Sequence, residues 1–205
     1  MLRILIACEE SQTICNEFRK LGHIAFSCDL QPCSGGHTEW HIQADCIPLL
    51  GMDWDLIIAH PPCTYLSNAG KRYLNVDEYG EYAARRLEQR EEAAAFFMLF
   101  TNLRCKHVAI ENPRGYMSEY YRKEDQVIHP WQFGDPVSKA TCLWLEGLPP
   151  LKPYVEHKPD NLDKDFWYRT RYLPADERRR QRSKTFPGIA HAIATQWSEY
   201  IINEG

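Results

Sequence analysis

Short apolar runs alternate along the chain with polar stretches that have helical spacing. The apolar runs lie at residues 2–8, 23–29, 41–45, 54–60, 107–111, 127–133 and 141–145. Helices are expected at residues 11–21, 77–103 and 189–202, the first capped by Ser11 and stopped by Gly22. This alternation predicts an α/β domain with a mostly parallel sheet and helices on both faces. The last two strands are expected to pair antiparallel at the sheet edge.

The chain is predicted to form a single domain over residues 1–205, with residues 149–185 as a basic and aromatic insert. The net charge is −4, yet residues 1–150 carry 14 basic and 20 acidic side chains, whereas residues 151–186 carry 10 basic and 6 acidic ones. Trp167, Tyr168 and Tyr172 stand among the arginines of the insert. Such a segment can hold phosphates and stack bases, or it can be a solvated charged loop.

The cysteines and the apolar runs indicate the compartment. Eight cysteines without a Cys-x-x-Cys pair predict reduced thiols in a cytoplasmic protein. The longest apolar run, Ala93–Phe100, is too short to span a bilayer, and the N-terminal run lacks a cleavage pattern, so no membrane association is expected. Four residues could bind zinc by their chemistry: Cys28, Cys33, His37 and His41. Their spacing is atypical of zinc sites, so no metal is predicted.

Polar residues stand where the predicted strands end. Asp29 and Asp45 close the second and third strands, Cys63 follows the fourth after Pro61 and Pro62, and Glu111 closes the fifth. Ligands of open α/β sheets bind beyond the carboxyl ends of the strands. An acid after the second strand can hold the hydroxyls of a ribose, although acids also end strands as simple turn formers.

Cys63 differs from the other cysteines because two prolines fix the backbone before it. A thiolate is a strong nucleophile, and Glu111 could supply a proton to the ring that it attacks, if its surroundings raise its pKa toward neutrality. A buried structural cysteine is the alternative when Cys63 is taken alone. His60 could orient a cofactor or the thiolate, or simply end its strand.

The segment Pro61–Arg72, with the sequence PPCTYLSNAGKR, resembles the catalytic loop of the DNA cytosine-5 methyltransferase family. In that family Pro-Pro-Cys is followed by a large apolar residue, Ser, one residue and Ala-Gly. Glu111-Asn112-Pro113 is similar to the family's Glu-Asn-Val element, and residues 133–136 with Lys139 are similar to its Gln-x-Arg-x-Arg segment. The motifs occur in the family's order over residues 1–147, as in a small, phage-type member.

The resemblance implies a Rossmann-like S-adenosylmethionine-dependent methyltransferase fold and methyl transfer to carbon 5 of cytosine in DNA. Cys63 would add to carbon 6 of the ring, and Glu111 would protonate or hydrogen-bond nitrogen 3. Residues implied to bind S-adenosylmethionine are Cys8, Asp29, Leu30, Asp45, Cys46 and Pro61. Residues implied to bind substrate are Ser67, Lys71, Arg72, Arg114 and Lys139. The partner is expected to be duplex DNA, with the base flipped out, or single-stranded DNA.

Three departures from the family keep other functions open. The segment Ala7–Gln12 has no glycine where the family has a glycine-rich turn, and Lys139 and Thr141 stand in place of its two arginines. A large target-recognition domain is also missing. The alternatives are a free nucleotide substrate, an inactive nucleic-acid- or nucleotide-binding protein of the same fold, and an amino-group methyltransferase. In the last class an aromatic residue follows Pro-Pro, where Cys63 stands here.

Overall fold

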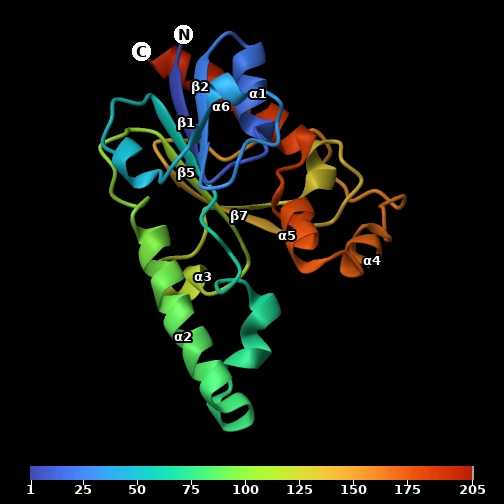
Figure 1. Ribbon diagram of the computed structural model, residues 1–205. Helices are drawn as coiled ribbons and strands as arrows, with labels where there is room; N and C mark the ends of the chain where they lie inside the picture. The colour runs from blue at the N-terminus through green and yellow to red at the C-terminus, as the bar shows by residue number, and fades with distance from the viewer. Residues whose placement is uncertain (205) are drawn as a thin grey trace.

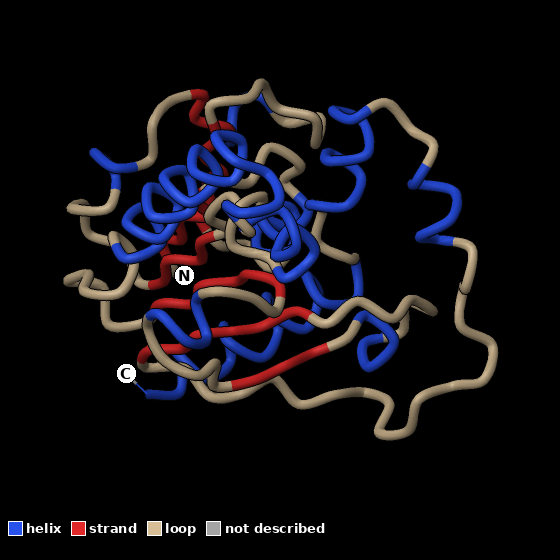
Figure 2. The backbone as a smooth tube through the Cα atoms, turned by 90° about the horizontal axis from the view of Figure 1, so that it is seen from below, coloured by secondary structure: helices blue, strands red, loops and turns tan. Residues whose placement is uncertain are grey.

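A seven-stranded sheet forms the centre of the computed structural model, which describes residues 1–204 (Figure 1). The strands are β1 (Arg3–Ala7), β2 (Ile24–Asp29), β3 (His41–Gln43), β4 (Leu56–Ala59), β5 (Val108–Pro113), β6 (Gln126–Ile128) and β7 (Thr141–Glu146). The helices are α1 (Thr13–Lys20), α2 (Val76–Met98), α3 (Met117–Tyr120), α4 (Phe166–Arg171), α5 (Ala175–Ser183) and α6 (Pro187–Glu204). From below, the strands run through the middle with helices on either side (Figure 2).

The strand order is β3-β2-β1-β4-β5-β7-β6. Strands β1 to β5 pair parallel with their neighbours, and β7 runs antiparallel to both β5 and β6. The predicted fold class, a mostly parallel sheet with helices on both faces, is therefore confirmed, as is the antiparallel pair at the edge. The strand β6 stops at Ile128, short of the predicted Phe133, because Pro130 has no N–H to donate and begins a 3₁₀ turn.

Alternate residues of the strands fill two apolar layers. In β1, Ile4 and Ile6 pack under α1 and α6, in a layer that also holds Phe18 and Trp197. Leu5 and Ala7 face the opposite layer, where Phe97 of α2 packs. Because β1 is buried on both faces, it reads as a continuous apolar run in the sequence.

Helix α2 extends below the sheet, with the 3₁₀ segment η3 (Asn68–Leu74) beside it (Figure 1). Its C-terminal part buries Ala94 and Phe97, whereas its first half is charged and mostly exposed, as the sequence predicts. Gly80, at φ 51° and ψ −130°, interrupts the helix near its start, a conformation that glycine adopts readily.

One predicted helix cap was wrong, and two helices were not predicted. Ser11 does not cap α1; its hydroxyl pairs with Thr13, and the buried carboxylate of Glu9 accepts the amide N–H groups of Ile14 and Cys15 instead, at 2.7 and 3.3 Å. The insert contains α4 and α5, which were not predicted from the sequence. Within residues 1–204, no helix is both long and apolar enough to cross a membrane.

Candidate active site

The segment after β4 and the segment after β5 lie against each other at the carboxyl edge of the sheet. We call residues 61–67 the Cys63 loop. The side chain of Asn112 donates to the carbonyl oxygen of Pro61 at 2.8 Å, and the backbone N–H of Tyr116 donates to Leu66 at 2.7 Å. Ser67 and Gly115 form a β-bridge. The Cys63 loop is therefore held on the strand that carries Glu111.

Backbone geometry folds the Cys63 loop tightly. The carbonyl oxygen of Cys63 accepts hydrogen bonds from the N–H groups of Leu66 and Ser67, at 3.1 and 3.0 Å. Where the loop meets the segment after β5, a Cβ atom on Gly115 would lie 1.9 Å from the carbonyl oxygen of Leu66. Only glycine fits this contact. The turn-forming sequence Asn-Pro-Arg-Gly at residues 112–115 is the feature of the sequence that indicates a tight turn here.

Cys63 is a free, partly exposed cysteine. Burial raises the pKa of its thiol, the negative charge of Glu111 raises it further, and the positive charge of Lys139 opposes both. These three side chains thus interact electrostatically at one place, and the resting sulfur is held as a thiol.

The role predicted for Glu111 required its surroundings to raise the pKa of its carboxyl toward neutrality, and the structure shows the opposite. Burial by itself raises the pKa of this carboxyl, but the hydrogen bond with His60 and the positive charges of Lys139 and His60 outweigh burial and lower it. His60 Nδ1 lies 3.1 Å from Glu111 Oε2. Glu111 therefore rests as a carboxylate and has to gain a proton before it can donate one.

A small pocket opens beside Glu111. His60, Glu111, Lys139 and Thr141 form its polar lining, and Ile128, Leu143, Ile189 and Ile193 form its apolar lining. The wall is completed by Ser183 and Thr185, at the end of the insert, and by Phe186, the residue that follows it. None of these three was predicted from the sequence as a site residue. Lys139 Nζ also donates to the carbonyl oxygen of Arg182 at 2.8 Å, so the insert is joined to the site.

Five of the residues predicted to bind the cofactor gather at the ends of β1, β2 and β3. The thiols of Cys8 and Cys46 interact, and the charges of Asp29 and Asp45 act on Cys46. Leu30, 70% exposed, lies next to Asp29 and contacts Gln43 through its carbonyl oxygen. An exposed apolar surface beside two carboxylates suits a nucleoside, because the apolar surface can cover the base and the carboxylates can bind the ribose hydroxyls. Pro61, the sixth residue, is buried at the start of the Cys63 loop.

The glycine-free segment after β1 adopts left-handed backbone conformations without glycine. Cys8 has φ 61° and Gln12 has φ 56°, both rare for residues with a Cβ atom. Gln12 is held there by its side chain, which donates to the carbonyl oxygen of His37 and accepts from the N–H of His37. The tight turn that glycines usually permit is therefore present, and the residues of this edge fit S-adenosylmethionine.

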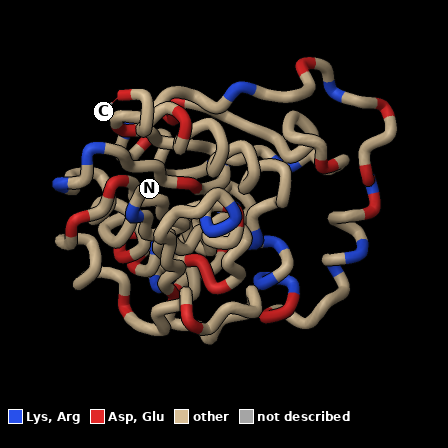
Figure 3. Tube along the Cα trace, turned by 90° about the horizontal axis from the view of Figure 1, so that it is seen from above, with Lys and Arg blue, Asp and Glu red and all other residues tan. Residues whose placement is uncertain are grey.

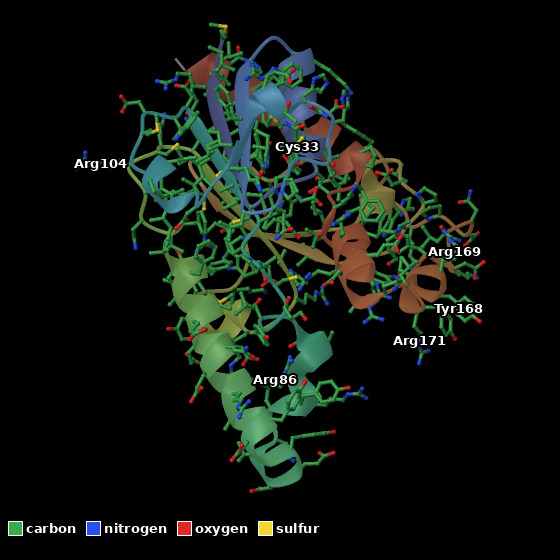
Figure 4. The ribbon with its side chains drawn as sticks, in the orientation of Figure 1. Cys33, Arg86, Arg104, Tyr168, Arg169 and Arg171 are labelled. Carbon is green, nitrogen blue, oxygen red and sulfur yellow. The ribbon has the colours of Figure 1, made fainter. Side chains whose placement is uncertain are left out.

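The residues predicted to bind substrate spread outward from the Cys63 loop. Ser67 and Lys139 are partly buried, whereas Lys71, Arg72 and Arg114 are exposed. Arg72 stacks on Tyr73 in η3. Arg86 of α2 lies over the rings of Tyr65 and Tyr73, and it fixes η3 against α2 (Figure 4).

The residues considered above as zinc ligands form hydrogen bonds with other groups. Cys28 donates to the carbonyl oxygen of Ala44, Cys33 donates to Gln12, and His41 contacts Ser27. Among residues 1–204, no three His, Cys, Asp or Glu side chains are arranged to hold a metal ion.

No protein-family model and no curated protein matches the chain. It is similar to a solved methyltransferase of Entamoeba histolytica, EhMeth, at 12% identity and a TM-score of 0.47, covering 78% of this chain and 57% of that one. It is also similar to a protein described as a putative DNA modification methyltransferase from an E. coli prophage (16% identity, TM-score 0.46, 85% and 56%). A third similar structure is the S. pombe Dnmt2 methyltransferase (14% identity, TM-score 0.46, 85% and 60%).

The chain thus spans less than two thirds of the length of each of these structures. At such identities they assign neither a substrate nor a residue to this protein. These three structures are methyltransferases by name. The strand order of this chain confirms the α/β fold class that was predicted from the sequence.

Proposed function

We propose that this protein transfers a methyl group from S-adenosylmethionine to carbon 5 of cytosine in DNA, through a covalent adduct on Cys63. One observation carries the proposal. A cysteine fixed by two prolines, a carboxylate and a lysine interact at the carboxyl edge of a parallel sheet, in a loop that the carboxylate's own strand holds in place. Nucleophile, proton carrier and positive charge are what addition to a pyrimidine ring requires.

The proposed chemistry assigns a step to each group. Carbon 5 of cytosine is a weak nucleophile. As the S–H bond of Cys63 breaks and releases its proton to solvent, the sulfur adds to carbon 6 and moves electron density toward carbon 5 and nitrogen 3. Glu111, after taking up a proton from solvent, delivers it to nitrogen 3. S-adenosylmethionine, when bound, supplies the methyl group that carbon 5 takes. Nitrogen 3 then returns its proton to Glu111, carbon 5 loses its proton to solvent, and Cys63 departs as a thiolate that takes up a proton again, which restores the ring.

Lys139 has two roles in this proposal. Its charge opposes the rise in the pKa of Cys63, which favours the thiolate, and it also favours the ionised form of Glu111. Because Nζ donates to the carbonyl oxygen of Arg182, its position depends on the end of α5. We therefore propose that the insert is part of the catalytic domain and closes the pocket beside Glu111.

The outer surface of the insert suits the DNA backbone. Tyr168 and Tyr172 are 61% and 69% exposed, with their rings edge to face at 5.1 Å. Arg169 is paired with Asp163, but Arg171 and Arg180 are exposed and have no acidic partner within residues 1–204. Arg169, Arg171 and Tyr168 point outward together (Figure 4). Basic and acidic residues both occur along the backbone of the insert (Figure 3). Unpaired arginines beside exposed rings can contact phosphates and stack bases.

Product analysis tests the proposed reaction. DNA is incubated with S-adenosylmethionine and protein, digested to nucleosides and analysed by mass spectrometry. The proposal predicts 5-methylcytosine from the wild type, none from Cys63→Ser, and wild-type yield from Cys105→Ser, a matched control whose thiol only donates to backbone carbonyls. A methylated amino group would favour the amino-group methyltransferase. No methylated base on duplex or single-stranded DNA would favour a binding protein.

A further inference from the structure

The first half of α2 packs beside η3 and the Cys63 loop rather than on the sheet. The C-terminal part of the helix packs under the sheet, whereas its first half extends beyond the sheet (Figure 1). In this first half Arg86 and Arg90 are partly buried, while the neighbouring Arg85 is exposed. Residues four apart lie on one face of a helix, so Arg86 and Arg90 face the same side.

Each of these two arginines lies over a tyrosine ring. The guanidinium carbon of Arg86 is 5.0 Å from the centre of the Tyr65 ring. The guanidinium carbon of Arg90 is 4.0 Å from the centre of the Tyr116 ring, and the hydroxyl of Tyr116 donates to Glu91 at 3.0 Å. A guanidinium group over an aromatic face is attracted by the ring, so both contacts hold a tyrosine against α2.

The two tyrosines belong to the two segments that meet at the carboxyl edge of the sheet. Tyr65 lies in the Cys63 loop, and the backbone N–H of Tyr116, directly before α3, donates to the carbonyl oxygen of Leu66 at 2.7 Å. One residue further along the loop, Ser67 forms the β-bridge with Gly115. The two ring contacts therefore hold both sides of this junction against a single helix.

The arginine side chains are not satisfied by hydrogen bonds alone. The Nε atoms of Arg86 and Arg90 are enclosed, and neither has a hydrogen-bond partner within residues 1–204. The nearest acidic contact of Arg90 is Glu91, at 3.5 Å. An enclosed N–H group without a partner costs free energy, and proteins carry such costs mainly where position matters to function.

We propose that Arg86 and Arg90 are positioning residues that clamp the Cys63 loop in the arrangement from which the sulfur attacks, an inference that rests on the proposed function. The loop has to keep the sulfur within reach of carbon 6, and a displacement of about 1 Å in a reacting group can cost about 100-fold in rate. Hydrogen bonds fix the loop to the segment after β5, and the arginines fix it to α2.

Glutamine variants remove the clamp while keeping polar side chains. The double variant Arg86→Gln, Arg90→Gln removes the positive charge over each ring. Its matched control is Arg85→Gln, because the exposed Arg85 pairs with Glu81 at 3.7 Å along the same helix. The double variant Arg86→Lys, Arg90→Lys keeps a cation at each position and serves as the conservative rescue. Thermal unfolding shows whether each variant folds.

Hydrogen exchange measures how firmly the loop is held. The amides of Leu66 and Ser67 donate to the carbonyl oxygen of Cys63, so their exchange reports opening of the loop. The proposal predicts exchange about tenfold faster in the double Gln variant than in the wild type, an intermediate rate in the double Lys variant, and the wild-type rate in Arg85→Gln.

Steady-state kinetics separate positioning from substrate binding. The proposal predicts that the double Gln variant lowers kcat about tenfold or more and leaves KM for DNA and for S-adenosylmethionine unchanged, because the clamp acts on the loop and not on the substrates. The double Lys variant should recover part of kcat. A raised KM for DNA with the wild-type kcat would overturn the inference, since the arginines would then bind DNA instead of holding the loop.

Unchanged exchange at Leu66 and Ser67 in the double Gln variant, or equally fast exchange in Arg85→Gln, would also overturn the inference. If the double variant does not fold, Tyr65→Leu removes one ring instead, and Tyr65→Phe should restore the protection that Tyr65→Leu loses. Absence of 5-methylcytosine with the wild type is a separate outcome. It removes the proposed function, whereas hydrogen exchange needs no reaction and still decides whether the arginines hold the loop.

Discussion

Asn112 and Pro61 are joined by a buried hydrogen bond, from the side-chain amide to the carbonyl oxygen at 2.8 Å. It connects the strand of Glu111 with the loop of Cys63. The Asn of the Glu111-Asn112 motif therefore has a structural task, which is to fix the distance between the two proposed reacting groups.

Asn112→Ala should lower the free energy of unfolding by about 1–3 kcal/mol, because it leaves the buried carbonyl oxygen of Pro61 without a donor. It should also slow methyl transfer, since the Cys63 loop is released from β5. Urea unfolding and 5-methylcytosine formation measure the two effects. Asn102→Ala, at an exposed position, is the control. An unchanged unfolding midpoint for Asn112→Ala would show that the hydrogen bond contributes nothing.

Gly115→Ala should impair methyl transfer more than stability. Its Cβ would lie 1.9 Å from the carbonyl oxygen of Leu66, so the Cys63 loop has to move. Gly51→Ala is the matched control because no atom lies within 4 Å of the added carbon. Methyl transfer at least about tenfold below the control is expected, equivalent to a loss of about 1.4 kcal/mol of transition-state stabilisation. Equal activity of the two variants would show that the tight contact is not needed.

Glu111→Gln should make Cys63 more reactive toward iodoacetamide while abolishing methyl transfer. The negative charge of Glu111 helps burial to raise the pKa of the thiol, so its removal lowers that pKa and increases the thiolate fraction at neutral pH. Lys139→Met should act in the opposite direction. Peptide mass spectrometry after timed alkylation follows Cys63 among the eight cysteines. Slower alkylation of Glu111→Gln would contradict the proposed interaction.

The double variant Arg171→Ala, Arg180→Ala should weaken DNA binding and make it less dependent on salt. Each lost phosphate contact reduces the slope of log affinity against log salt by about one. Arg104→Ala is the control, because Arg104 is exposed on a different part of the molecule (Figure 4). Fluorescence anisotropy with labelled duplex, at several salt concentrations, measures the slope. A slope equal to that of the control would remove the insert from the DNA-binding surface.

The sheet was predictable from the sequence because its central strands are buried on both faces. An apolar run that is followed by prolines, such as Leu56–Ala59, predicts both a buried strand and the place where the strand ends. Cys63 lies in the loop after β4 and Glu111 lies in β5, the neighbouring strand, as expected from the sequence. Helices α4 and α5 were missed since their residues are almost all polar or exposed, so no apolar periodicity marks them.

The pKa shifts of the site residues could not be predicted from the sequence in this way. The pKa of Glu111 depends on His60, which lies 51 residues before it, and on Lys139, which lies on the segment before β7. The cap of α1 likewise depends on Glu9, whose carboxylate reaches past Ser11 to Ile14. Local patterns identify candidate groups, but only the packed sheet shows which charges act on one another.

Trapping of a covalent adduct tests the central claim most directly. The protein is incubated with S-adenosylmethionine and DNA that contains 5-fluorocytosine, in which the fluorine blocks loss of the group on carbon 5 and so prevents release of the cysteine. The account predicts a protein–DNA adduct at Cys63, identified by mass spectrometry, with the wild type and with Cys105→Ser but not with Cys63→Ser. Absence of the adduct from folded wild-type protein, on both duplex and single-stranded DNA, would contradict the covalent mechanism.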